Sequence, residues 1–259
     1  MPLIKTSNPA LSANTFRNLS GGYGTLNGGA IDATARMTLD GTINKTGTLL
    51  LCSMATAAWT WYSFVKSGDL SVAGPMMALG LFGGLIFGLV TSFKREWSPV
   101  TAPIYALLEG LALGGLSALL NFRYPGIAMQ AVGLTFGTLF VLLLAYRTHL
   151  IKVTQKFRLG VVAATGGIFL FYMLEMLLSF FGINFTTVNG ASGIGILFSL
   201  VVVGVAALNL VLDFDFVEQG VTYGAPKYME WYAAFGIMVT LVWLYIEVLR
   251  LLSKMRSRN

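Results

Sequence analysis

Long, nearly uncharged apolar runs make up most of this chain, and polar residues gather in the short stretches between them. Each run reaches the roughly 20 residues that an α-helix needs to cross a bilayer. The longest run, residues 159–212, is long enough for two crossings, and the turn-prone GINFTTVNG at 182–190 divides it. The pattern therefore predicts seven spans, near residues 46–65, 70–93, 97–122, 124–146, 159–181, 191–213 and 231–252.

The length of these runs also predicts the fold class. A backbone in lipid must satisfy its hydrogen bonds within each segment, which favours helices, whereas the strands of a membrane barrel alternate apolar and polar residues over about ten positions. We expect an all-α membrane protein, a seven-helix bundle formed by residues 46–259. Residues 1–45 are polar and contain the Gly-rich SGGYGTLNGG. They hold no apolar run long enough for a signal peptide, and we expect a disordered cytoplasmic tail.

Glycines recur at four-residue spacing within three of the predicted spans, which lets helix backbones approach one another closely. We expect these positions to serve packing rather than ligand binding. They are Gly80, Gly84 and Gly88, then Gly110 and Gly114, then Gly133 and Gly137.

Composition narrows the class of protein. Hydrophobic residues make up 56% of the 259 residues and charged ones 11%, with a mean hydropathy of +0.74, whereas soluble domains are about 25% charged. The net charge of +6 is spread over too few basic residues for a nucleic-acid-binding face. One cysteine, Cys52, excludes an internal disulfide, and one histidine, His149, excludes the usual imidazole-rich zinc sites.

Basic residues predict the orientation in the membrane. Successive connections from the N-terminus hold four, one, two, one, four and no Lys or Arg residues, and this alternation predicts a cytoplasmic N-terminus. The C-terminal segment, with Arg250, Lys254, Arg256 and Arg258, then lies outside, against the rule. Either the last helix is re-entrant, or the first spans determine the orientation of the whole chain. The sequence leaves this choice open.

Acidic side chains within the spans are the candidate functional groups, because an ionisable group at membrane depth is costly. Asp213 lies at the end of the sixth span, with Asn209 one turn earlier on the same face, while Asp215 points away from that face. A partner for Asp213 must come from another helix, and Glu247 is the candidate.

Two adjacent carboxylates share one proton, which makes a pH switch and a site for a hard cation such as calcium. The alternative is an interfacial Asp213 and a Glu247 paired with Arg250 or Lys254. Glu109 and Glu175 are further buried acids, and each either lines a permeation path or bonds a neighbouring helix while protonated.

Three segments carry a resemblance to a known family. MTLDGTINKTGTLLL at 37–51, followed by seven spans and the closing LDFDFVEQG and LYIEVLRLLSKM, resembles the Bax inhibitor-1 family, in particular a bacterial branch with a polar N-terminal extension. The resemblance implies two three-helix layers around a central last helix and a pH-sensitive calcium leak channel in the bacterial inner membrane. It also implies a carboxylate pair between the sixth and last helices, here Asp213 and Glu247.

Two departures from the family pattern affect this pair. The second acid is a glutamate, and its separation from Asp213 is long. A helix starting at Trp231 would carry Glu247 about 24 Å along the membrane, so we expect the residues around GAPKYMEWYAAF to form a separate interfacial segment before a helix starting near Gly236. Otherwise Glu230 replaces Glu247 as the nearest acid, with Asp215 the other alternate.

Enzyme activity is not expected. Gly190-Ala191-Ser192-Gly193 matches the GxSG pattern of rhomboid-type proteases, but His149 precedes it and lies in a loop, so a serine dyad is unavailable. The Gly-x-Gly-Asp context of aspartyl intramembrane proteases is absent from the sequence as well. We therefore expect a cation channel without a cofactor. The alternative is a membrane interaction protein that binds a protease or translocon partner through its tail and transports nothing.

Overall fold

The computed structural model describes residues 36–182, 188 and 190–258. Within them it contains seven α-helices and one short 3₁₀ turn, η2 (Arg95–Trp97). The helices are α2 (Leu39–Ser67), α3 (Leu70–Phe93), α4 (Ser98–Arg123), α5 (Ile127–Arg147), α6 (Gln155–Ser179), α8 (Gly193–Thr222) and α9 (Met229–Arg258).

Six of the described helices, α3 to α6, α8 and α9, are long and apolar enough to cross a membrane. The expected all-α membrane fold is therefore confirmed. Helix α2 is as long as the others but less apolar, with threonines whose hydroxyls donate back to carbonyls of the preceding turn, as Thr60 does to Thr56. The seventh span stays a prediction.

Helix α2 begins at Leu39, earlier than the predicted start at Thr46, because a local cap is present. The Thr38 side chain accepts a hydrogen bond from Gly41 N at 3.0 Å, which satisfies a free amide of the first turn. The preceding Met37 is 2% exposed, and its amide donates to Ala225 O at 2.7 Å. Residues 36–45 are thus ordered, and the rest of the expected tail, 1–35, lies outside the described residues.

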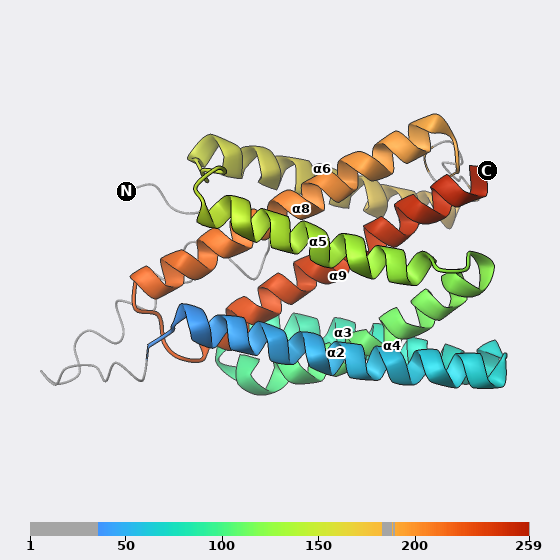
Figure 1. Ribbon diagram of the computed structural model, residues 1–259, viewed down its shortest axis with the longest axis horizontal. Helices are drawn as coiled ribbons and strands as arrows, with labels where there is room; N and C mark the ends of the chain where they lie inside the picture. Colours follow the sequence, from blue (N-terminus) through green and yellow to red (C-terminus); the bar gives the residue numbers. More distant parts are fainter. Residues whose placement is uncertain (1–35, 183–187, 189, 259) are drawn as a thin grey trace, which may run out of the picture.

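Helix α9 lies between two groups of helices (Figure 1). It contacts α2 and α4 of the group that also contains α3, and α5 and α8 of the other. Helix α6 packs against α8 at the edge. The buried share of the most apolar stretch is 61% in α9 and 6% in α6, so α9 is central and α6 is peripheral.

The directions of the helices define two ends of the bundle. Helix α4 runs parallel to α9, because Ser98 bonds Tyr228 O at 3.1 Å and Ser117 bonds the Tyr245 hydroxyl at 2.7 Å. We call the end where α2, α4, α6 and α9 begin the Glu230 end, and the opposite end the Lys254 end. Helices α3, α5 and α8 run the other way (Figure 1).

The predicted glycine packing is confirmed between α2 and α4 and, at Gly80, between α3 and α4, and it is wrong in α5. A Cβ at Gly114 would collide with the backbone of Ala57 in α2, and one at Gly110 with the backbone of Ser53. Gly133 and Gly137 have open space instead. At Gly80 of α3, a Cβ would lie 2.5 Å from Leu108 O in the backbone of α4. Close helix approach therefore requires glycine where α4 meets α2 and α3, and not in α5.

Replacing Gly114 with valine is expected to lower the free energy of unfolding by about 3 kcal/mol, the upper range for forcing bulk into a packed interface. Gly133→Val is the matched control, because its side chain would meet open space. Unfolding by denaturant in detergent micelles measures both. Equal losses in the two variants would contradict the α2–α4 contact.

Candidate functional site

Buried polar side chains recur along the facing surfaces of α8 and α9. None of the six is more than 6% exposed. On α9 they are spaced by seven residues, which places them on one helix face. We call this set the polar seam: Ser199, Asn209 and Asp213 on α8, with Thr240, Glu247 and Lys254 on α9.

Lys254 fixes the register between the two helices. Its Nζ donates to Ser199 Oγ at 2.8 Å, to Gly195 O at 3.2 Å and to Val188 O at 2.8 Å. Because α8 and α9 are antiparallel, residues closer to the start of α9 lie level with residues closer to the end of α8. Thr240 therefore lies level with Asp213, and Glu247 lies about 10 Å further along the bundle axis at the rise of a helix.

This register bears on the predicted carboxylate pair. Helix α9 begins at Met229, not near Gly236, so the expected separate interfacial segment is wrong. Met229, Tyr232 and Ala233 are core residues, each at most 1% exposed, and their burial extends the helix. Direct pairing of Asp213 with Glu247 stays a prediction, and the register favours two separate acids on one seam.

Glu247 is 2% exposed and is held from α6 and from its own helix. The Tyr172 hydroxyl lies 3.1 Å from Oε1 and 3.2 Å from Oε2, within hydrogen-bond reach of both oxygens. Arg250 Nη1 lies 3.4 Å from Oε1, and its guanidinium stacks over the Tyr172 ring at 4.9 Å. The pairing of Glu247 with Arg250, predicted as the alternative to the dyad, is confirmed.

Asp213 is also 2% exposed, deep between the helices. Asn209, one turn earlier on the same face, donates from Nδ2 to Thr165 Oγ1 of α6 at 2.8 Å and to Val205 O at 2.9 Å. The polar seam thus reaches α6 at two heights, through Thr165 and through Tyr172.

The alternate Asp215 points away from the seam, as its position in the sequence predicts. It forms an ion pair with Arg158 of α6 and accepts a hydrogen bond from Gln219 Nε2 at 2.6 Å. One turn further, Glu218 accepts a hydrogen bond from the Tyr146 hydroxyl of α5. These bonds tie α5, α6 and α8 together at the Glu230 end.

The alternate Glu230 is 0% exposed and is bound at the same end. It forms ion pairs with Lys45 of α2 and with Lys227, the latter at 2.9 Å. The backbone N and the hydroxyl of Thr38 each donate to Oε1 at 2.8 Å. Glu230 therefore joins α2 to the start of α9, and its partners are cations and donors.

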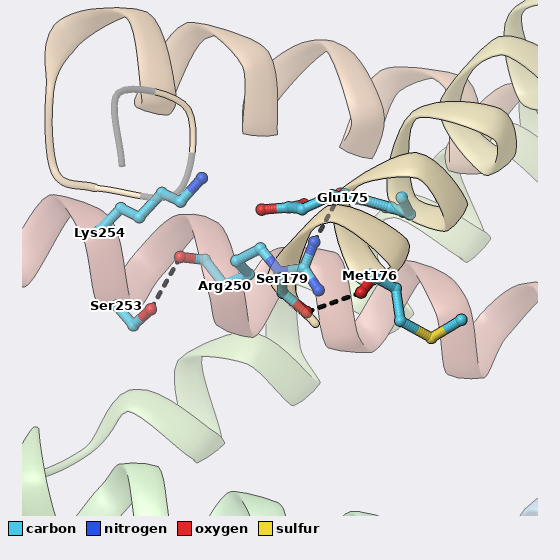
Figure 2. Close-up of a pocket in the computed structure, with 7 residues that line it drawn as sticks. Glu175, Met176, Ser179, Arg250, Ser253 and Lys254 are labelled. Atoms are coloured by element: carbon cyan, nitrogen blue, oxygen red, sulfur yellow. Dashed lines mark hydrogen bonds between the residues drawn. The ribbon is translucent and has the colours of Figure 1, made fainter. Parts of the chain in front are cut away.

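The two expected pathway acids lie in different places. Glu109 points from α4 toward α3, where a Cβ at Gly84 would lie 2.8 Å from its Oε2. Glu175 of α6 lines a cavity beside Lys254 (Figure 2). Of the two, only Glu175 borders the polar seam.

The described part of the chain holds no group of three or more His, Cys, Asp or Glu side chains that could bind a metal. Ser192 of the GxSG segment is the N-cap of α8 and accepts a hydrogen bond from Gly195 N at 3.0 Å. His149 follows α5, at the Glu230 end, so these two residues lie at opposite ends of the bundle.

Two of the C-terminal basic residues, Lys254 and Arg256, have partners within the fold. Lys254 binds α8 and Val188 O, and Arg256 donates to Pro125 O at 2.7 Å and to Gln130 Oε1 at 3.1 Å. Helix α9 is one continuous helix, so the re-entrant alternative is wrong. That Lys254 sets the register of α9 against α8 was not predicted from the sequence. Its spacing of seven residues from Glu247 indicated that the two side chains share a helix face.

Comparison with known proteins agrees with this architecture. A model of the family described as Bax inhibitor 1 like matches residues 8–257, almost the whole chain. No curated protein and no solved structure matches the chain. With its helices packed around a buried last helix and its family match spanning them all, the chain belongs to the Bax inhibitor 1 like family.

Proposed function

We propose that this protein is a pH-sensitive cation leak channel, with calcium as the main ion, and that the polar seam is its pathway. The supporting observation is the placement of Asp213 and Glu247 in the seam, each 2% exposed between two apolar helices. Acids at membrane depth mark ion pathways, and carboxylate oxygens are ligands that can replace the water around calcium.

The proposed gating follows from the charge of these acids. Protonated carboxyls are neutral and do not attract cations, whereas ionised carboxylates do. The register favours Asp213 and Glu247 as separate acids about two turns apart along the seam, and in that arrangement each contributes its own charge to the path. Flux is therefore expected to rise with pH. Calcium is the permeant ion here, and no cofactor is proposed.

The interactions at the two ends of the bundle are those expected of a closed pathway. At the Glu230 end, the ion pair of Glu230 joins α9 to α2, and that of Asp215 joins α8 to α6. At the other end, the Lys254 ammonium occupies the seam and would repel a cation. Opening requires at least one of these ends to loosen.

The test is calcium flux into liposomes that contain the purified protein and a calcium-sensitive dye, between pH 5 and pH 8. We expect flux above that of protein-free liposomes, increasing with pH. Failure to carry calcium at any of these pH values would remove the channel proposal, and the partner-binding alternative would take its place.

The Glu230 end is proposed to face the cytoplasm of a bacterial inner membrane, because the basic residues outside the last helix cluster there. The exposed Glu96 and Lys66 lie at opposite ends. After Cys52→Ser, we expect an impermeant maleimide added to intact cells to label Lys66→Cys and not Glu96→Cys. Labelling of Glu96→Cys alone would reverse the orientation.

A further inference from the structure

Helices α6 and α9 line an open polar cavity at the Lys254 end. Its volume is about 570 Å³, within the range of small-molecule binding sites, ~300–1,000 Å³. Tyr172, Glu175, Met176 and Ser179 line it from α6, and Arg250 and Lys254 from α9 (Figure 2).

The two basic groups of this cavity, Lys254 and Arg250, differ in how many of their N–H donors are engaged. All three ammonium protons of Lys254 have acceptors, namely Val188 O, Gly195 O and Ser199 Oγ. Arg250 carries five N–H donors. Among the bonds of the described residues only its Nη1 is engaged, and its side chain is 38% exposed. Arg250 therefore offers the cavity further donors, which suit the planar, bidentate recognition of a phosphate.

Glu175 supplies the opposite charge. Its carboxylate extends across the cavity from α6 toward the side of Lys254, beside the Arg250 guanidinium (Figure 2). An acid and a guanidinium in one cavity complement a ligand that carries both a phosphate and an ammonium.

The surroundings of the cavity are those of a lipid-facing surface. The most apolar stretch of α6 is only 6% buried. Large apolar side chains adjoin the cavity residues along α6, with Met173 40%, Leu174 50% and Leu177 47% exposed. A ligand in this cavity therefore has apolar helix surface next to its polar head.

We propose that the cavity binds the phosphoethanolamine head of a membrane phospholipid. Arg250 holds the phosphate, Glu175 accepts from the primary ammonium, and the acyl chains lie along the apolar surface of α6. A site with this chemistry prefers phosphatidylethanolamine to phosphatidylglycerol, which has no ammonium, and to phosphatidylcholine, whose ammonium has no N–H. The inference is independent of ion conduction.

Thermal unfolding of the purified chain in detergent tests this site, because a ligand that binds the folded state raises the unfolding temperature. The probes are short-chain phosphatidylethanolamine, phosphatidylglycerol and phosphatidylcholine, and the soluble glycerophosphoethanolamine. We expect a dose-dependent rise with phosphatidylethanolamine that exceeds the rise with each of the others. No rise with this lipid, or an equal rise with the soluble head alone, would overturn the proposal.

Variants assign the contacts. Arg250→Gln should weaken the apparent affinity for phosphatidylethanolamine at least tenfold, and Glu175→Gln should remove the preference over phosphatidylglycerol. Arg123→Gln, at the same end but outside the cavity, should behave as the wild type. Because Arg250→Gln also disturbs Glu247, a second variant separates the two effects. Ser179→Phe fills the cavity without changing charge and should abolish the response. Wild-type affinity in Ser179→Phe would place the lipid elsewhere.

Discussion

Replacing Asp213 with asparagine should flatten the pH dependence of calcium flux. Asparagine keeps the shape of the side chain and cannot ionise, so its charge no longer follows pH. One pK unit is worth about 1.4 kcal/mol. If ionisation changes the free energy of channel opening by the equivalent of two pK units, the wild-type flux changes up to about a hundredfold. Asp213→Asn should lose most of that range. Flux into dye-loaded liposomes between pH 5 and pH 8 measures this.

Asp40→Asn is the matched control, because Asp40 is exposed in the first turn of α2. It should retain the wild-type profile. Glu247→Gln should also flatten the profile, and the double variant then decides between the two arrangements of acids. Separate acids predict additive effects, whereas a proton-sharing pair predicts strong non-additivity. A full wild-type response in both single variants would refute the role of these acids.

Replacing Glu230 with alanine should lower the free energy of unfolding by about 3–5 kcal/mol, the usual cost of removing one partner from a buried ion pair. Glu230 is 0% exposed, and its loss leaves Lys45, with a side chain 18% exposed, without its carboxylate. The hydroxyl and backbone N of Thr38 lose their acceptor as well. Denaturant unfolding in detergent gives the difference.

Glu96→Ala provides the comparison, because Glu96 is an exposed acid at the same end of the bundle. We expect it to change the unfolding free energy by less than about 0.5 kcal/mol, as surface substitutions usually do. A Glu230→Ala variant as stable as Glu96→Ala would mean that the Glu230 network does not hold α2 to α9.

The helices could be predicted from the sequence because their signal is local. Uncharged apolar runs located every helix that the structure describes, and α3 matched its predicted range of 70–93. The start of α2 was missed because its first turn is polar and is stabilised by contacts with Glu230, a residue far away in the sequence. The start of α9 was missed for a similar reason, since burial of Met229 and Tyr232 against other helices extends it.

The candidate site was predicted only in part. The cost of charge in lipid pointed to Asp213 and Glu247, which are both buried. Their relative height depends on how α8 slides along α9, and tertiary contacts such as that of Lys254 with Ser199 set this register. No local pattern gives it, although the seven-residue spacing of Glu247 and Lys254 showed that they share a face.

Thiol modification inside the polar seam tests its role as the ion pathway most directly. Ala206 lies level with Glu247, and Ala234 is equally buried in α9 but belongs to no part of the seam; both are 0% exposed. After Cys52→Ser, Ala206→Cys should react with a cationic, membrane-impermeant thiol reagent at the pH that supports calcium flux, and the reaction should block that flux. Ala234→Cys should not react. Flux that persists while Ala206→Cys stays unmodified, or equal reaction at both positions, would contradict a pathway through the seam.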